Sequence, residues 1–403
     1  MSDMSWVRSP VDRNSAHWST RRTGKAVLVL VPHIVAGTRL LDLLPLLEAD
    51  HRIQVVFTVP EPWESWRATE DFVRAQDGVV LPWAQARRGD YDLVLAGSTR
   101  GIDEVGGPVL LVPHGGGFGQ YRPWRPPDAD RGWTPQLGLG PDQLMREGRV
   151  RADAVVLTHD RELEILTRAC PPAVPTAIVA GDIAFDRLTA SLPFRQLYRR
   201  ALGVPDDRGL VVVTSTWSER SAFGRHPDLF ERIMAGLPPG EYQVIGALHP
   251  QIWSHHGYRQ VRAWLGPCLR DGLKLLAPEE GWRAALVAAD HLIGDYGSTT
   301  GYAAGIGRPV LLATDGTQPL LPGTPAAVLA EHAPRWQPDL PLVPQLKAAQ
   351  NAGDTTMISS LLTSRPGRAG AILRATMYRL LDLSEPARAV PVSPVAQPRL
   401  LSS

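Results

Sequence analysis

The stretch LIGDYGSTTG, residues 292–301, ends an apolar run at an aspartate and continues with hydroxyl and glycine residues. The apolar run predicts a buried strand and the small residues after it predict a helix, so the stretch indicates a strand-to-helix turn. Backbone N–H groups and the helix dipole at such a turn attract anions. A serine or threonine at a helix start is also common for structural reasons, but three hydroxyls together favour a phosphate site. The candidate contacts are Asp295, Gly297, Ser298, Thr299 and Thr300.

Two histidines follow predicted strands at positions where the ring can face a ligand. His114 stands before three glycines in PHGGGFG, and glycines let a ligand approach the backbone closely. We interpret His114, with Gly115 and Gly116, as part of a functional site; the alternative is a structural histidine beside a glycine-rich turn. His249 precedes a proline in GALHPQIWSHHG, and we interpret it as a contact to a phosphate or a leaving group.

Metal binding is disfavoured at both places where the residue types permit it. His255 and His256 are adjacent, so on a helix their side chains point about 100° apart and cannot easily bind one ion together. Asp128 and Asp130 lie in a proline- and arginine-rich run that favours an exposed loop with acids paired to arginines. The chain also lacks the glycine-rich lysine motif of P-loop enzymes, which excludes that class. We therefore expect no metal and no cofactor.

The elements that position these residues follow a βαβ rhythm. Short apolar runs alternate with helical patterns, and continuous apolar strands predict parallel sheets covered on both faces. The first series of expected strands is 26–31, 53–59, 92–97, 108–113, 154–159 and 176–181. The second series is 209–216, 242–249, 273–278, 291–295 and 309–314. The candidate residues, including Gly181 and Thr216, follow the carboxyl ends of these strands, where open α/β sheets bind ligands.

Length and composition restrict the class of protein. A chain of 403 residues favours two domains. The net charge of +1 gives no general attraction for nucleic acid or anionic membranes, so no nucleic-acid partner is expected. Two distant cysteines, Cys170 and Cys268, are expected to be core thiols in a reducing compartment. No signal peptide or spanning segment is evident, so a cytoplasmic location is expected, with peripheral contact at the inner face of the membrane as an alternative.

The predicted domain organisation follows the two strand series. Residues 1–24 are expected to form a flexible N-terminal arm and residues 25–190 a first Rossmann-like domain. Residues 205–365 are expected to form a second Rossmann-like domain. A helix over 366–383 and a flexible proline-rich tail over 384–403 complete the prediction.

Five patches, in the right order, resemble the CDP-glycerol glycerophosphotransferase family of teichoic-acid primases and polymerases. They are PHGGGFG, VAGDIAFDRL, VVVTSTWSE, ALHP and AADHLIGDYGSTTGYAAGIGRPVLL, within roughly residues 108–314. The resemblance implies a divergent member with the GT-B fold: two Rossmann-like domains with parallel sheets facing a central cleft. It also implies that the first domain binds the acceptor and the second the nucleotide donor.

The same resemblance implies roles for individual residues. His114 would be the general base that takes the proton of the acceptor hydroxyl, and His249 would contact the diphosphate of the donor. Ser298 and Thr299 would hold phosphate oxygens at the helix start, with Thr216 nearby. Phosphoryl transfer depends mainly on positioning and charge stabilisation, which neutral hydroxyls and backbone amides can supply without a metal.

Several positions depart from the family pattern. Gly297 stands where the first of two serines is expected, and Ser218 and Ala184 replace two arginines. Tyr302 and Ala303 replace a Phe-Asp pair, which removes a carboxylate. Because these changes remove charge near a diphosphate, a UDP- or dTDP-sugar donor stays open within the same fold.

The expected function is transfer of a glycerol-phosphate-like or glycosyl group from a nucleotide-diphosphate donor to an acceptor hydroxyl, in cell-envelope polymer synthesis. The expected partners are CDP-glycerol or a nucleotide sugar, and a cell-envelope acceptor. Two alternatives share the fold. One is a catalytically lapsed nucleotide-binding or regulatory protein, and the other is an enzyme similar to UDP-sugar 2-epimerases.

Overall fold

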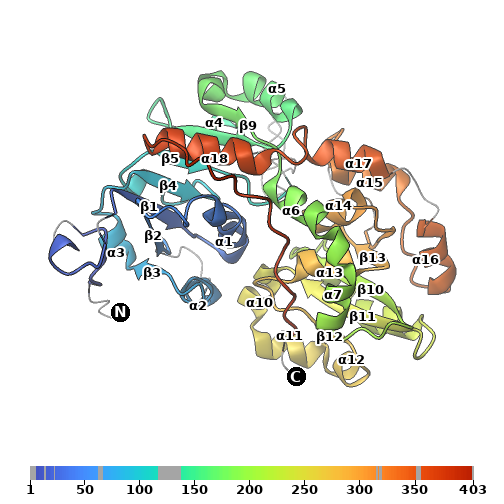
Figure 1. Ribbon diagram of the computed structural model, residues 1–403. Helices are drawn as coiled ribbons and strands as arrows, with labels where there is room; N and C mark the ends of the chain where they lie inside the picture. The colour runs from blue at the N-terminus through green and yellow to red at the C-terminus, as the bar shows by residue number, and fades with distance from the viewer. Residues whose placement is uncertain are drawn as a thin grey trace. The chain divides into compact units, whose positions relative to one another are not determined.

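The computed structural model divides into two units (Figure 1). Among the described residues, the first unit runs to Ala184 and takes up the chain again over Ser364–Val392. The second comprises Phe185–Thr363 and the segment that follows Val392. The described residues are 6–12, 15–21, 23–61, 67–116, 138–314, 316, 320–350 and 355–401.

The first unit is built on a 7-stranded parallel sheet with the order β3-β2-β1-β4-β5-β8-β9. In that order its strands are β3 (Val79–Leu81), β2 (Ile53–Thr58), β1 (Lys25–Leu30), β4 (Leu93–Ala96), β5 (Val109–Leu111), β8 (Ala154–Leu157) and β9 (Ala177–Val179). The chain winds in one direction from β1 and in the other from β4. The carboxyl ends of β1 and β4 therefore mark the switch point at which α/β sheets bind ligands.

Alternate residues of these strands pack against opposite faces of the sheet. Val27, Val29 and Leu95 belong to a core that α1 and α18 cover, whereas Leu28 and Leu30 belong to a core on the other face. Because both faces are covered, the strands are mostly apolar on both faces, as the sequence predicts.

Six α-helices belong to the described part of the first unit, and one of them comes from the far end of the chain. They are α1 (Ile34–Leu41), α2 (Arg67–Arg74), α3 (Trp83–Ala86), α4 (Pro141–Leu144), α5 (Asp160–Ala169) and α18 (Ala369–Leu380). A short antiparallel hairpin joins β6 (Met145–Arg146) and β7 (Arg149–Val150). Leu373 and Met377 of α18 are buried in the same core as β1.

The second unit has a 5-stranded parallel sheet with the order β12-β11-β10-β13-β14. In that order its strands are β12 (Lys274–Leu275), β11 (Tyr242–Leu248), β10 (Gly209–Ser215), β13 (His291–Gly294) and β14 (Val310–Leu312). The helices are α6 (Ile183–Ser191), which starts in the first unit, α7 (Arg195–Ala201), α8 (Ala222–Arg225), α9 (Leu229–Ala235), α10 (Pro250–His256), α11 (Tyr258–Trp264), α12 (Gly266–Arg270), α13 (Trp282–Ala288), α14 (Ser298–Gly305), α15 (Pro325–His332), α16 (Leu342–Gln350) and α17 (Thr355–Leu362). Val212 and Val213 pack on opposite faces. Two parallel α/β units of this kind confirm the predicted fold class.

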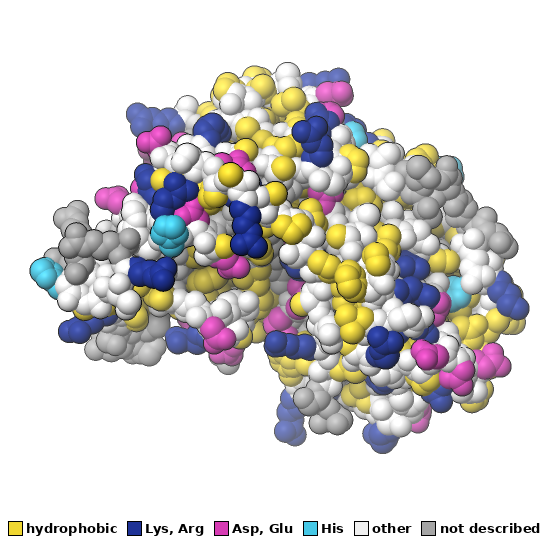
Figure 2. Space-filling model, in the orientation of Figure 1, with side chains coloured by type: hydrophobic (Ala, Val, Ile, Leu, Met, Phe, Trp, Pro, Cys, Tyr) yellow, Lys and Arg dark blue, Asp and Glu magenta, His cyan; other side chains and the backbone are white. Residues whose placement is uncertain are grey.

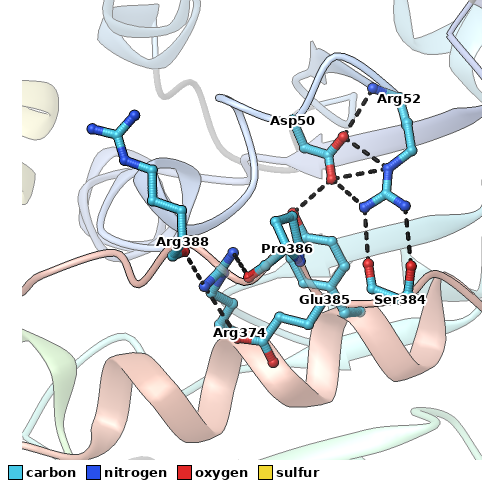
Figure 3. A network of polar contacts seen from close by, with 8 residues as sticks. Asp50, Arg52, Arg374, Ser384, Glu385, Pro386 and Arg388 are labelled. Carbon is cyan, nitrogen blue, oxygen red and sulfur yellow. Dashed lines mark hydrogen bonds and ion pairs between the residues drawn. The ribbon is translucent and has the colours of Figure 1, made fainter.

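The chain beyond α18 is bonded first to the first unit (Figure 3). Arg374 donates to the carbonyl oxygens of Arg388, at 2.9 Å, and Pro386, at 3.1 Å. Arg52, which is paired with Asp50, donates to the carbonyl oxygen of Ser384 at 2.9 Å. The chain here therefore follows the surface of the first unit through arginine contacts.

The last residues are then bonded to the second unit through backbone groups. The Tyr198 hydroxyl donates to the carbonyl oxygen of Val395 at 2.7 Å, and Leu401 N–H donates to the Leu275 carbonyl at 2.9 Å. Leu400 forms an antiparallel bridge with Leu276 beside β12. Where the sequence predicts a flexible tail over 384–403, the structure thus shows a bonded segment as far as residue 401.

The remaining surface features agree with the composition. On the face that Figure 2 shows, basic and acidic side chains are interspersed, and the net charge is +1. In the N-terminal arm, Val7 and Gln85 exchange two hydrogen bonds of 2.9 and 2.8 Å. Cys170 and Cys268 are buried free thiols, as predicted. Within the described residues, no helix combines the length and apolar character needed to span a bilayer.

Candidate functional site

In the first unit, the carboxyl ends of β1, β4 and β5 bring three sequence-distant segments together. These strands are neighbours in the sheet, so the residues that follow them share one edge. The rings of His33 and His114 lie 5.0 Å apart between centroids, with their planes at 79°. Gly97 lies beside α1, where an added Cβ would come within 2.9 Å of the Ala36 Cβ. The glycine thus permits this close packing of strand end and helix.

His114 is held by a bond that determines which ring nitrogen carries hydrogen. Its Nδ1 lies 2.8 Å from the carbonyl oxygen of Gly97. A carbonyl oxygen only accepts, so we assign the hydrogen to Nδ1, and the neutral ring then has its lone pair on Nε2. The residue is exposed. This arrangement suits a general base, because Nε2 can accept a proton.

Three other histidines follow strands and make the opposite bond. His33, His159 and His249 each cap the helix that follows, and in each the ring accepts a hydrogen bond from a backbone N–H of that helix. The Nδ1 to nitrogen distances are 3.1, 3.0 and 3.1 Å in that order. In a neutral ring of this kind the hydrogen is on Nε2, so the outer nitrogen is a donor. Among these four strand-end histidines, His114 alone presents an acceptor.

A buried ion pair that the sequence analysis missed fixes the chain beside His114. Arg39 of α1 donates from Nη1 to Asp182 Oδ1 at 3.1 Å and from Nη2 to the Gly115 carbonyl at 3.2 Å. The two side chains are 9% and 3% exposed. Asp182 Oδ1 also accepts from the Ala184 N–H at 2.9 Å. Arg39 therefore links the turn after β9 to the residue that follows the predicted base.

The predicted glycines of this half lie around the same ion pair. Gly181 adopts φ +89, a left-handed conformation that favours glycine, and it directly precedes Asp182. Gly115 and Gly116 follow His114 and are partly buried. Arg39, Gly115, Gly181 and Asp182 share the lining of a small hollow under this edge of the sheet. The first unit thus brings together the predicted residues His114, Gly115 and Gly181.

In the second unit, Asp295 ties two loops together instead of facing solvent. Asp295 is buried, with 1% of the residue exposed. Oδ2 accepts from the Thr216 N–H at 2.8 Å and the Ala222 N–H at 3.1 Å, and Oδ1 accepts from the Gly297 N–H at 3.1 Å. Burial raises the pKa of this carboxyl group, while these hydrogen bonds oppose the rise. Asp295 therefore positions the turn that carries the phosphate-site candidates.

The hydrogen bonds of Asp295, which we call the Asp295 hub, also explain the residue types at Thr216 and Gly297. The Thr216 hydroxyl donates its hydrogen to Asp295 Oδ2 at 2.8 Å, so it has no hydrogen left to donate to a phosphate oxygen. A Cβ added at Gly297 would lie 2.7 Å from Thr216 Cγ2. The serine of the family pattern would clash here, which gives a physical reason for glycine at 297. Ser218, at an arginine position of that pattern, is bonded to the Tyr296 hydroxyl at 2.8 Å.

The three hydroxyl residues after Gly297 divide into two kinds. Ser298 and Thr299 form the first turn of α14 and are partly exposed, and their N–H groups have no partner in the part of the chain that the structure describes. Thr300 is 1% exposed, and its hydroxyl faces Gly294, where an added Cβ would lie 2.5 Å away. The N-terminus of α14 can therefore bind an anion through Ser298 and Thr299, whereas Thr300 points into the core.

His249 lies at the end of β11, the strand beside β10. The β10 loop holds Thr216, so the strand ends of this unit bring His249, the Asp295 hub and the start of α14 to one edge. An apolar hollow lies next to this edge, lined among others by Leu312, Ala326 and Leu329. Donor groups beside an apolar hollow suit a phosphate linked to an aromatic base.

No metal centre is found at either edge within the described ranges, which contain no group of three or more His, Cys, Asp or Glu residues that could hold an ion. Asp128 and Asp130, considered above for metal binding, lie outside the described residues.

Comparison with known proteins agrees with the fold. No family model matches the sequence, and no curated protein matches it. Among solved structures, the chain is similar to the wall teichoic acid polymerase TagF with CDPG, with a TM-score of 0.60, 11% identity and 89% of each chain covered.

Two further structures, with bound UDP-GlcNAc or UDP, are also similar. The UDP-GlcNAc 2-epimerase from Neisseria meningitidis bound to UDP-GlcNAc gives a TM-score of 0.54 and 14% identity, covering 89% of this chain and 100% of the other. S. aureus MnaA with UDP gives 0.52 and 12%, covering 92% and 100%. The resemblance to the teichoic-acid family is therefore confirmed at the level of the fold: this chain has the GT-B architecture that TagF and the UDP-GlcNAc 2-epimerases share.

Proposed function

We propose that this chain is a transferase that moves a glycerol-phosphate-like or glycosyl group from a nucleotide-diphosphate donor to an acceptor hydroxyl, in the synthesis of a cell-envelope polymer. The observation that carries the proposal is the opposite partner of Nδ1 in two strand-end histidines. His114 Nδ1 lies against a carbonyl oxygen, which assigns the lone pair to Nε2, and His249 Nδ1 accepts from a backbone N–H, which assigns the hydrogen to Nε2. Transfer to a hydroxyl needs both an acceptor for its proton and donors for the leaving diphosphate.

The first unit would serve the acceptor. His114 Nε2 takes the proton as the acceptor oxygen attacks the transferred group, and the bond from Nδ1 to the Gly97 carbonyl stabilises the imidazolium that forms. Arg39 acts through the backbone of Gly115 and keeps the ring in place.

The second unit would hold the donor. The N–H groups and hydroxyls of Ser298 and Thr299, at the positive end of the α14 dipole, bind phosphate oxygens. His249 Nε2–H adds a further donor, and the apolar hollow beside Asp295 offers an apolar surface next to the donors. The solved structures that share this fold contain CDPG, UDP-GlcNAc or UDP, which supports a nucleotide-linked donor.

A donor panel tests the proposal directly. The purified full chain is incubated with CDP-glycerol, CDP-ribitol, UDP-sugars and dTDP-sugars, with and without a polyol-phosphate acceptor, and free nucleotide is measured. We expect one donor to raise the unfolding temperature and to release its nucleotide only when an acceptor is present. Binding of a donor without any release would contradict transfer and would favour a nucleotide-binding protein without catalysis.

A second candidate function is epimerisation at C2 of a UDP-sugar. It is favoured by the match to the UDP-GlcNAc 2-epimerase from Neisseria meningitidis over the whole length of that chain. Incubation with UDP-GlcNAc in deuterium oxide distinguishes the two, because an epimerase introduces deuterium at C2 and a transferase does not. Deuterium uptake without an acceptor would replace the transferase proposal.

A further inference from the structure

The second unit carries a group of arginines at the amino ends of its strands, the sheet edge opposite to the proposed donor site. Arg195 and Arg199 lie one turn apart on α7, Asp290 precedes β13, and Arg308 lies two residues before β14. We call these four residues the arginine cluster. Leu292 pairs with Val310 in the parallel ladder, so Asp290 and Arg308, each two residues earlier, lie opposite each other at neighbouring strand starts.

The carboxylate of the arginine cluster already accepts three hydrogen bonds. Asp290 Oδ1 accepts from Arg195, and Oδ2 accepts from Arg199 Nη1 at 2.9 Å and from the Leu210 N–H at 2.7 Å. Arg199 also donates to the Arg208 carbonyl at 2.6 Å, so its role is structural. Three guanidinium groups against one carboxylate leave two positive charges in excess.

Two donors of the arginine cluster have no acceptor. The Nε atoms of Arg195 and Arg308 are buried and make no hydrogen bond to any residue that the structure describes. Burial and the nearby charge of Arg195 lower the pKa of Arg308, which agrees with two guanidinium groups close together in a poorly solvated place. Asp206 and Asp207, in the nearby loop, are exposed, and neither forms an ion pair with a described arginine of the cluster.

We propose that the arginine cluster is a binding site for a phosphate group, separate from the donor site at the start of α14. A phosphate presents several acceptor oxygens to the planar forks of Arg195 and Arg308 at once. It also neutralises the positive charge that remains beyond the single negative charge of Asp290. The site lies at the amino ends of the strands, so it does not depend on the transferase proposal.

The phosphate could belong to a soluble metabolite or to a lipid headgroup. Phe194 directly precedes α7 and is 41% exposed, and Leu197 lies in its first turn and is 36% exposed. Apolar side chains therefore lie next to the cluster in sequence. Both sources present the same phosphate chemistry to Arg308, and the experiment has one arm for each.

The test measures binding of inorganic phosphate and pyrophosphate to the full chain by calorimetry, and co-sedimentation with vesicles of phosphatidylcholine alone or mixed with phosphatidylglycerol. Arg308→Gln is the main variant, and Arg308→Lys is the charge-retaining variant. Arg200→Gln is the matched control, because Arg200 is an exposed neighbour of Arg199 on the same helix. Thermal unfolding of each variant shows that the fold is retained.

We expect saturable binding that Arg308→Gln weakens about tenfold or more, that Arg308→Lys weakens less, and that Arg200→Gln leaves within about twofold. If binding of the soluble anions depends on Arg308, the ligand is a soluble phosphate. If only binding of the mixed vesicles depends on Arg308, the ligand is a lipid phosphate. Equal losses in Arg200→Gln and Arg308→Gln would overturn the site, because general charge would then explain the binding. Loss of all phosphate binding in Ser298→Ala, or no binding in either arm, would overturn it too.

Discussion

His114 and His249 occupy comparable places, each directly after the carboxyl end of a parallel strand, yet they present opposite chemistry. His114 Nδ1 donates to a backbone carbonyl, whereas His249 Nδ1 accepts from a backbone N–H. One hydrogen bond to the main chain thus decides whether the outer nitrogen is an acceptor or a donor. The comparison teaches that the function of a strand-end histidine is set by its backbone partner and not by its position alone.

The residues that support the two histidine-bearing edges also differ. In the first unit, the buried Asp182 is neutralised by Arg39. In the second unit, the buried Asp295 has hydrogen-bond donors around it but no cation among its hydrogen-bond partners in the described chain. An ion pair and a ring of backbone donors are two ways to satisfy a buried carboxylate. Both supports hold loops in place, and in the proposed function the neighbouring residues contact the substrate.

The largest expected effect comes from His114→Asn, which breaks the comparison on the acceptor side. The asparagine amide can still donate to the Gly97 carbonyl, but the acceptor at Nε2 is lost. We expect turnover to fall by about 10²–10⁴-fold, the usual contribution of a general base, with donor affinity within about twofold. Nucleotide release and calorimetric donor binding measure the two quantities.

His33→Asn is the matched control for this change. Its ring lies 5.0 Å from that of His114, and an asparagine oxygen can keep the cap of α1. We expect it to retain most of the turnover. Equal losses in the two variants would show that the ring pair, and not the tautomer of His114, matters for activity.

His249→Asn sharpens the comparison on the donor side. The asparagine oxygen can accept from the Gln251 N–H and preserve the cap, while the Nε2–H group disappears. A hydrogen bond to a charged group contributes about 1.5–3 kcal/mol, so the donor Kd should rise by roughly ten- to hundredfold. His249→Gln, which offers an N–H farther out, should recover part of the affinity. Native donor affinity in His249→Asn would rule out this contact.

Much of this arrangement could be predicted from the sequence, because it depends on strand ends. Apolar runs buried on both sheet faces locate the strands, and the strand ends then locate His114, His249 and Ser298. The ion pair of Arg39 with Asp182 could not be predicted in this way. An arginine inside a helix usually faces solvent, and nothing in its local sequence indicates a partner 143 residues away.

The direction in which side chains point after a strand could not be predicted from the sequence either. Asp295, Thr216 and Thr300 were predicted to face the donor, yet Asp295 and Thr216 bond each other and Thr300 is buried. A turn has no fixed periodicity, so its side-chain directions depend on which loops pack beside it. The proline-rich composition of the last residues likewise indicates a tail, but their backbone groups find partners on both units.

Ser298→Ala and Thr216→Val separate contact from support at the second edge. Removal of the Ser298 hydroxyl should raise the donor Kd about tenfold, the lower end of the effect of one hydrogen bond to a charged group, because the backbone N–H groups of this turn stay in place. Thr216→Val removes a donor from the buried Asp295 and should lower the free energy of unfolding by about 1–3 kcal/mol, with a smaller effect on donor affinity. Donor titration and denaturant unfolding measure the two effects. If Thr216→Val lost more donor affinity than Ser298→Ala, Thr216 would itself be a contact to the donor.

The smallest expected effect concerns the C-terminal segment. The first unit binds this segment through the paired charges of Arg52 and Asp50, and the second unit binds it through hydrogen bonds to its backbone. The hydrogen bond from Arg52 holds the pKa of Asp50 well below its usual range. Its stabilisation is therefore complete above about pH 4, where the unfolded carboxyl is ionised, and is lost as the pH falls below that value. Asp50→Asn should speed amide exchange in residues 384–392 at neutral pH, because it lowers the free energy of local opening by about 1 kcal/mol or less. This difference between the variant and the native chain should vanish in acid. Ser191→Ala removes the acceptor of the Val395 N–H, a bond of 2.9 Å, so its effect on residues 393–401 should not change with pH. Equal acid sensitivity in both stretches would mean that the carboxylate of Asp50 is not what distinguishes them.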